Sequence, residues 1–269
     1  MMKKLFAASA LMAVFAVSVP PLLAGSILIV NGSAGTSEPG TTAAITDNLE
    51  LLHLAVGNTV TVSSGIPMNL TPYSQVWDIR FSNTFALTVD QRGQYLDFLQ
   101  AGGGMFLMGE NASFPDRNDS VLAMIAEAGG GSLGFVVPDS FQTVLAPFTG
   151  PNAVSTVSYA APGGVDGTGS GDWITKVAGL EQGTGVAWGV GDLSNAAAGA
   201  LTVIFDVNFM MNSFDLPNSQ NLTKNLIGFV QGEVEPPPPQ GVPDAASTLL
   251  LVGFGLAALS RVRRYLATK

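Results

Sequence analysis

The sequence of 269 residues contains no cysteine, and this absence excludes three kinds of chemistry. No disulfide bond can stabilise the fold, no thiolate can act as a nucleophile, and no thiolate can bind a metal ion. Histidine is almost as rare, because His53 is the only one in the chain. A serine–histidine–aspartate triad would have to use this residue. We interpret His53 instead as a partly buried residue of a helix.

Positive charge is scarce in the central part of the chain. Of the 11 lysines and arginines, six lie in the first four or the last nine residues, which leaves five against all 20 acidic residues. An acidic surface with so few cations repels phosphate groups. Nucleic-acid binding is therefore excluded, and the composition suits an exported protein.

The first 24 residues predict a secretory signal peptide. Lys3 and Lys4 form a basic start, an apolar run extends from Leu5 to Val19, and small residues ending at Ala24 suit cleavage. Residues 1–24 would engage the Sec translocon and leave the remainder of the chain outside the cytosol. An uncleaved anchor is the alternative.

The last 28 residues, 242–269, combine a short polar motif, an uncharged apolar run and a basic cluster, after a proline-rich linker at 233–241. The apolar run is shorter than the roughly 20 residues of a typical membrane span, and the basic cluster favours a cytoplasmic C-terminus. This tail resembles the PEP-CTERM sorting signal of Gram-negative bacteria, with Val-Pro-Asp-x-x-Ser-Thr in place of the usual Pro-Glu-Pro. The residues that carry the resemblance are Val242, Pro243, Asp244, Ser247, Thr248, Arg261, Arg263 and Arg264.

The resemblance, which covers residues 242–264, has consequences for location and partners. It implies processing by an exosortase, transient anchoring in the inner membrane through a C-terminal transmembrane helix, and a final place at the cell surface or outside the cell. It also implies a link to exopolysaccharide and biofilm. A plain single-pass anchor is the alternative.

Residues 25–232 form one predicted α/β domain, because apolar runs alternate with segments of helical spacing. Helices between strands favour a parallel sheet with right-handed crossovers and helices on both faces, which is a three-layer, flavodoxin-like arrangement. Asp90 is the expected N-cap of the second helix. The predicted strands are 26–30, 59–62, 76–81 and 105–108, and the predicted helices are 41–56, 91–100 and 120–128.

The later part of this domain has a different composition. Residues 133–191 are rich in glycine, proline and threonine and contain short alternating runs, which predicts a β-rich excursion with edge strands. Residues 200–206 predict a return to the core of the sheet, and residues 219–230 predict a closing helix.

Two passages of this domain, 95–111 and 203–209 with the helix around 221–229, resemble the class I glutamine amidotransferase-like fold. The similarity is to its non-enzymatic branch, as in gliding-motility transporter auxiliary proteins. Enzymatic members carry a cysteine nucleophile in the turn after a strand. Glu110 stands at that place here, and a carboxylate cannot form the thioester. The resemblance therefore implies a domain that has lost this reaction.

Polar side chains follow the ends of the predicted strands, where ligands bind in open α/β sheets. If they converge, they form a pocket suited to sugar hydroxyls, a small ligand or a peptide. Alternatively, they satisfy backbone groups of the loops and pair with one another. The candidate residues are Asn31, Arg80, Glu110, Asn111, Arg117, Asn118, Asp206 and Asn208.

Two further hypotheses concern carboxylate side chains, as calcium ligands or as catalytic groups. Asp166 and Asp172 lie in a glycine-rich loop that could hold calcium, although it lacks the further oxygen ligands that calcium requires. We expect no other metal and no cofactor. Glu110 paired with Asp206 or Asp116 would suit a glycan-acting hydrolase. We expect instead an exported, non-catalytic surface or matrix protein that binds a ligand or partner.

Overall fold

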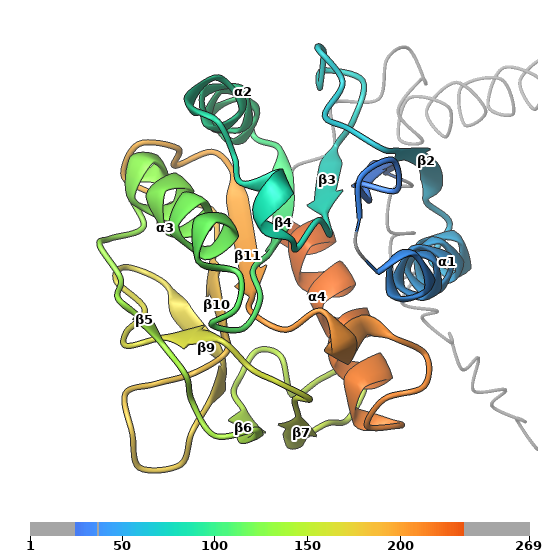
Figure 1. Ribbon diagram of the computed structural model, residues 1–269. Coiled ribbons are helices and arrows are strands. Elements are labelled where there is room, and N and C mark those ends of the chain that lie inside the picture. Colours follow the sequence, from blue (N-terminus) through green and yellow to red (C-terminus); the bar gives the residue numbers. More distant parts are fainter. Residues whose placement is uncertain (1–24, 37, 234–269) are drawn as a thin grey trace, which may run out of the picture.

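The computed structural model describes residues 25–36 and 38–233 (Figure 1). The predicted signal peptide, most of the linker and the whole sorting signal lie outside the described residues. Within the described part, no helix is both long enough and apolar enough to cross a bilayer.

The described chain contains four α-helices and two short 3-10 helices. The helices are α1 (Pro39–Ala55), η1 (Asn83–Phe85), α2 (Val89–Gln100), α3 (Pro115–Ala128), η2 (Asn208–Met210) and α4 (Asn218–Glu233). The strands are β1 (Ser26–Val30), β2 (Thr59–Ser63), β3 (Gln75–Asp78), β4 (Gly104–Met108), β5 (Phe135–Val136), β6 (Phe141–Val144), β7 (Thr156–Ser158), β8 (Gly164–Val165), β9 (Asp172–Lys176), β10 (Gly185–Trp188) and β11 (Ala200–Ile204).

Nine strands form one mixed sheet in the order β2-β1-β3-β4-β11-β10-β9-β6-β7. The first five in this order are parallel, as the alternation of strands and helices predicts. The remaining four extend the sheet in antiparallel fashion, so the β-rich excursion joins the main sheet rather than forming a separate unit. Strands β5 and β8 form a small second sheet.

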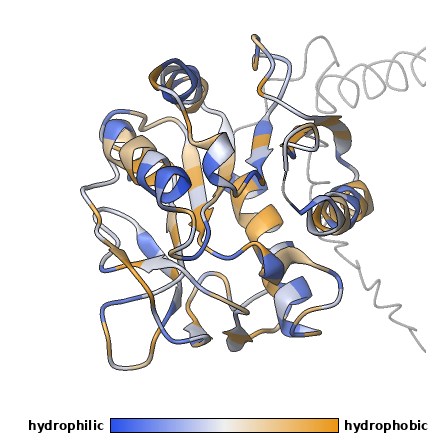
Figure 2. Cartoon of the chain, in the orientation of Figure 1, coloured by the Kyte–Doolittle hydropathy of each residue, from blue (hydrophilic) through white to orange (hydrophobic). Residues whose placement is uncertain are grey.

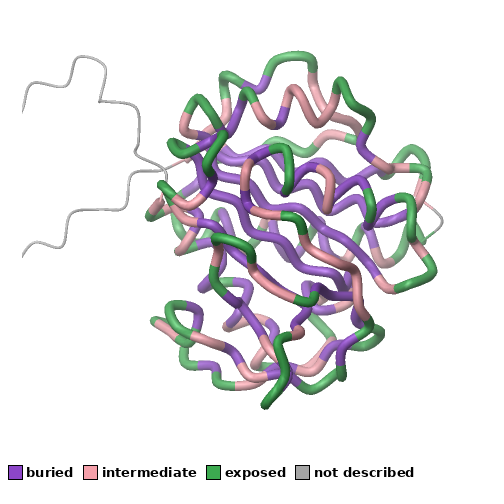
Figure 3. Tube along the Cα trace, turned by 90° about the vertical axis from the view of Figure 1, so that its left-hand side faces the viewer, coloured by how far each residue is buried: buried purple, intermediate pink, exposed green. Residues whose placement is uncertain are grey.

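Helices cover both faces of the sheet, which confirms the three layers (Figure 1). Side chains alternate along each strand, so Ile27 and Ile29 pack on one face with α1 and α4, while Leu28 and Val30 pack on the other with α2 and α3. Strands β1, β3, β4, β10 and β11 in the middle of the sheet are almost wholly buried (Figure 3), whereas the edge strand β2 is largely exposed. Hydrophilic residues are common on the helices (Figure 2).

Three predicted boundaries were wrong. Strand β3 ends at Asp78 rather than residue 81, because the Asp78 carboxylate accepts the Arg80 backbone N–H at 3.1 Å. Helix α3 starts at Pro115 rather than residue 120, since proline suits a first helical turn. The N-cap of α2 is Thr88 rather than Asp90, and it forms a capping box with Gln91.

Candidate functional site

The end of β3 is organised around Asp78, a fully buried carboxylate. Arg80 donates to both of its oxygens, from Nε at 2.8 Å and from Nη2 at 2.6 Å. The Tyr95 hydroxyl of α2 donates to Asp78 Oδ2 at 3.0 Å, and Arg117 Nη2 of α3 lies 3.4 Å from the same oxygen. Two arginines, a tyrosine and an aspartate are thus bound to one another beneath the surface.

The electrostatics of this cluster hold Asp78 in its charged form. Burial alone would raise the pKa of Asp78, but the charges of Arg117 and Arg80 outweigh it and lower the pKa to about 2. Burial, with the nearby charge of Asp78, raises the pKa of Tyr95 well above its ordinary value. Each group keeps the protonation state that its neighbours require, so the cluster suits a structural role better than proton transfer.

Arg117 also holds two backbone segments together. Its Nε donates to the Met108 carbonyl at 2.9 Å, and its Nη1 donates to the Phe85 carbonyl at 3.0 Å. The first turn of α3 brings this fully buried side chain to the end of β4. One residue later, Asn118 accepts the Glu110 N–H at 2.8 Å.

Glu110 follows β4 but is only 2% exposed. Its Oε2 accepts the Val207 backbone N–H at 2.7 Å, and its Oε1 accepts from Asn111 Nδ2 at 2.8 Å. Burial, and next the charge of Asp206, raise the pKa of Glu110 to about 8. The carboxyl group links the turn after β4 to the turn after β11, instead of facing solvent.

The backbone around Glu110 is packed without room for a substrate. A Cβ on Gly109 would lie 2.2 Å from Phe205 Cδ1, and a Cβ on Gly163 would lie 2.3 Å from the Glu110 carbonyl oxygen. Only glycine fits at these two positions. The strand-end site that the sequence predicts is therefore filled by the protein itself.

Asp206, the second residue after β11, is also fully buried. Its Oδ1 accepts the N–H groups of Asn208 at 2.7 Å and Phe209 at 3.2 Å, and its Oδ2 accepts the Ala161 N–H at 3.1 Å. Burial raises its pKa, while the amide donors act in the opposite direction. Asp206 thus holds the turn into η2 and a loop of the β-rich excursion.

The predicted site residues therefore meet in two groups rather than around one open pocket. Arg80 and Arg117 converge on Asp78, which sequence reasoning missed although it interrupts the apolar run 76–81. Glu110, Asn111 and Asn118 bond among themselves. Asn31 instead donates to Thr46 Oγ1 of α1 at 3.3 Å and accepts the Ser33 N–H at 3.0 Å. Asn208 Nδ2 contacts Met211 Sδ at 3.5 Å.

His53 is fully buried, not partly buried as the sequence suggested. It packs edge-on against Trp77 with ring centroids 4.9 Å apart, and its Nδ1 lies 3.1 Å from Asn58 Nδ2. Burial lowers its pKa to about 3. His53 lies beside the start of β2, at the amino-terminal ends of the parallel strands. Glu110 lies at the opposite ends of these strands, after β4.

Sequence reasoning missed the pattern Gly-Gly-Ser-Leu-Gly at 130–134. Its Ser132 follows α3, whereas a nucleophilic serine of such a motif stands in a strand-to-helix turn. In the calcium candidate, Asp166 Oδ1 accepts the Gly134 N–H at 2.7 Å, and Asp172 is exposed at the start of β9. Among residues 25–36 and 38–233, no group of three or more histidine or acidic residues is arranged to hold a metal ion.

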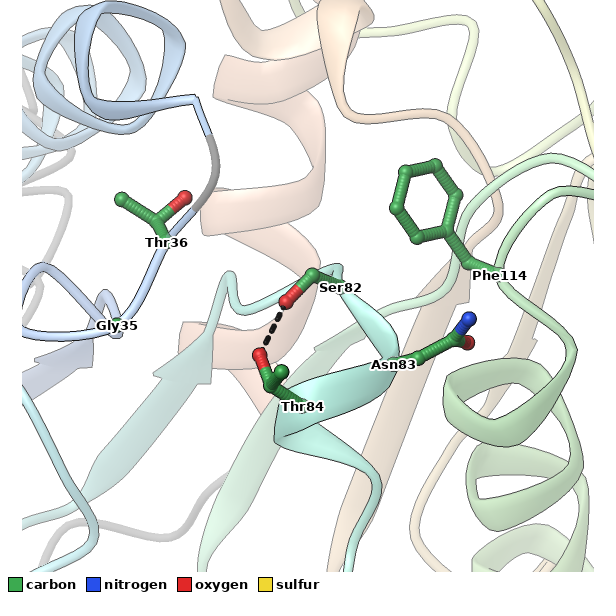
Figure 4. A pocket seen from close by; sticks show the side chains of 6 residues that line it. All are labelled: Gly35, Thr36, Ser82, Asn83, Thr84 and Phe114. Atoms are coloured by element: carbon green, nitrogen blue, oxygen red, sulfur yellow. Dashed lines mark hydrogen bonds between the residues drawn. The ribbon is translucent and has the colours of Figure 1, made fainter.

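An open pocket of about 280 Å³ lies beside these buried groups (Figure 4). It is formed by three connections that leave the carboxyl ends of β1, β3 and β4. Sequence reasoning missed its residues because none of them is charged and most are small. The only available signal was that they follow neighbouring strands. The lining residues are Gly35, Thr36, Ser82, Asn83, Thr84 and Phe114.

Comparison with known proteins identifies the fold. No family model matches the chain, and no curated protein matches it. The mmIFT52 N-terminal domain aligns with 81% of this chain and 100% of its own length, at 11% identity and a TM-score of 0.52. The exo-beta-1,4-mannosidase Op5Man5 from Opitutaceae bacterium strain TAV5 aligns with 77% of this chain and 36% of its own length, at 8% identity and a TM-score of 0.50.

A thua-like protein from Bacteroides uniformis aligns with 76% of this chain and 90% of its own length, at 14% identity and a TM-score of 0.46. Identities this low concern the fold alone. The chain therefore has an α/β fold, with a mixed and mostly parallel sheet, that is similar to class I glutamine amidotransferase-like domains.

Proposed function

We propose that the chain is an exported, exosortase-sorted, non-catalytic protein of the cell surface or extracellular matrix. It acts through a ligand- or partner-binding α/β domain and is linked to exopolysaccharide or biofilm. The observation that carries the non-catalytic part is the position of Glu110. Its carboxyl group is buried and bonded to Val207 and Asn111, where a related enzyme would expose its nucleophile.

The two ends of the chain support export and sorting. A basic and apolar start would direct the chain to the Sec translocon, and the tail 242–264 provides the motif, apolar helix and arginine cluster that an exosortase would process. The acidic and cysteine-free body between them needs neither a reducing compartment nor disulfide formation. In this proposal the membrane is a temporary location.

A glycan-acting hydrolase has less support. Such an enzyme needs two carboxyl groups that face the same sugar from an open cleft. Glu110 and Asp206 are buried, and backbone amides bind both. Asp116 is exposed on the first turn of α3. The likeness to a mannosidase covers about a third of that enzyme's length and concerns the fold alone.

The test is to fractionate cells that express the full chain and to determine the intact mass of the protein in each fraction. We expect the surface or extracellular form to begin near Gly25 and to have lost the residues beyond about Asp244, as processing of a sorting signal requires. A variant with glutamine at Arg261, Arg263 and Arg264 serves as the control and should remain unprocessed. Lys269 still attached to the surface form would favour the plain anchor.

A further inference from the structure

The open pocket lies where the strand order changes direction. The chain runs from β1 outward to β2 and then returns to β3 on the other side of β1, so the connections after β1 and β3 diverge at this point. Ligands of open α/β sheets bind at such a switch, outside the carboxyl ends of the strands. A volume of about 280 Å³ lies near the lower limit of small-molecule sites, so the pocket suits one ring-sized ligand.

The pocket carries no charged side chain among its lining residues. The nearby Arg80 and Arg117 are buried and bound to Asp78, so they offer no cation to a ligand. Acidic residues flank the pocket instead: Glu38 precedes α1, and Asp116 lies in the first turn of α3. Their charges oppose the positive ends of the two helices and disfavour an anionic ligand.

A pair of hydroxyl groups at the centre of the pocket can form hydrogen bonds with a ligand. Ser82 Oγ and Thr84 Oγ1 are 2.7 Å apart (Figure 4). One hydroxyl donates to the other, so the accepting hydroxyl keeps its hydrogen for a ligand, and both keep lone pairs. Asn83 is already used, because its Oδ1 accepts the N–H of Asp116 at 3.1 Å. Thr84 is the exposed member of the pair.

An aromatic ring forms the opposite side of the pocket. Phe114 stands across from Thr36, with the Ser82–Thr84 pair between them (Figure 4). The ring packs edge-to-face against the buried Phe81, with centroids 6.0 Å apart and an interplanar angle of 85°. This contact fixes the ring, and a fixed aromatic face buries apolar area at little entropic cost.

We propose that this pocket binds one unit of a neutral saccharide, with the C–H face of the sugar on Phe114 and its hydroxyls on Thr84 and Ser82. The inference rests on the proposed function, because it names the ligand class of the same binding domain. The pocket offers a hydroxyl pair and an apolar ring without a cation, which matches a polyol and not a phosphate or a uronate.

The test measures saturation transfer by NMR from the full chain, in a detergent without a sugar headgroup, to the methyl glycosides of glucose, galactose, mannose and N-acetylglucosamine. A single small subsite gives dissociation constants on the order of millimolar, so each glycoside is titrated to roughly 50 mM. We expect at least one neutral glycoside to saturate the protein, and glucuronate to bind more weakly.

Variants assign the binding to the pocket. Thr84→Val removes one hydroxyl at almost constant volume and should weaken binding by about 3- to 10-fold, as expected for a lost hydrogen bond. Thr84→Trp should fill the pocket and abolish binding. Thr61→Val makes the same change as the first variant on the exposed surface of β2 and should leave the affinity unaltered. Circular dichroism verifies that each variant is folded.

Three results would overturn the inference: no transfer to any of the neutral glycosides, equal affinity in folded Thr84→Trp or Thr84→Val, or tighter binding of glucuronate. The sorting proposal is judged separately, from the mass of the mature C-terminus. A pocket that binds no sugar therefore leaves sorting intact, and an unprocessed tail leaves the pocket result intact.

Discussion

At the scale of single residues, buried polar groups in this protein bind one another. Asp78 interrupts an apolar strand, yet it receives Arg80 from the same strand end, Tyr95 from α2 and Arg117 from α3. A buried carboxylate without partners would cost several kcal/mol, on the order of the penalty for moving an unpaired charge out of water. The sequence reveals the charge in the strand but not its partners, because two of them come from distant helices.

Glu110 illustrates the same limit. The resemblance to amidotransferase-like domains correctly indicates its place after the fourth strand, but it cannot indicate the direction of the side chain. That direction depends on the Val207 amide, which lies 97 positions further along the chain. Of the two interpretations that the sequence left open, mutual pairing describes the contacts observed here.

His53 provides a prediction at this scale. Its lowered pKa of about 3 means that the folded protein keeps the imidazole neutral, while the unfolded chain binds a proton below the ordinary value of 6.5. Stability that is fully present above this pH is therefore lost as the pH falls, by about 2 kcal/mol between pH 7 and pH 5. The ring resonances of this single histidine, followed by NMR, should not titrate between pH 7.5 and pH 5.

The control for this experiment is the same resonance in urea, which should titrate near pH 6.5 as expected for a solvated imidazole. A midpoint near that value in the folded protein would show that the ring is accessible to water. It would contradict both the burial of His53 and its packing against Trp77.

At the scale of elements, the strong patterns were the reliable ones. The apolar run of β1 and the spacing of α1 predicted both elements to within about two residues, as expected for long periodic segments. The start of α3 was missed because its first turn is polar. Its amide groups are capped from another connection, through Asn83 Oδ1, rather than by a neighbour in sequence.

The cap of α2 provides a second prediction. Thr88→Ala removes the hydroxyl that accepts the Gln91 N–H, so the free energy of unfolding should fall by about 1 kcal/mol, the usual effect of losing an N-cap. Asp90→Ala is the matched control in the same helical turn, and it should cost less than about 0.5 kcal/mol because it loses only a charge near the helix end. Urea unfolding measures both variants, and a larger loss for Asp90→Ala would restore Asp90 as the cap.

At the scale of the whole molecule, buried carboxyl groups connect the turns that follow different strands of the sheet. Glu110 links the turn after β4 to the turn after β11, and Asp206 links that second turn to the β-rich excursion. The parallel and antiparallel parts of the sheet meet at β11. Glu110 therefore stabilises the junction between these two parts, while the open pocket lies beside it.

The link between these turns requires a Glu110 carboxyl group that stays buried and neutral near physiological pH. Its raised pKa of about 8, against an ordinary 4.5, means that the folded protein holds a proton that the unfolded chain releases. Stability that is present below pH 4.5 is therefore lost as the pH rises toward 8. Glu110→Gln removes this titration, so wild type should lose roughly 3 kcal/mol relative to the variant between pH 5 and pH 8.

The most direct measurement is therefore urea unfolding of wild type and Glu110→Gln at pH 5 and at pH 8, with Glu127→Gln on the exposed side of α3 as the control. We predict that the difference in unfolding free energy between wild type and Glu110→Gln shifts by roughly 3 kcal/mol in favour of the variant at the higher pH, and that the control shows no comparable shift. A difference that is the same at both pH values would mean that Glu110 is ionised and solvated, as in an open reaction centre, and would contradict the account.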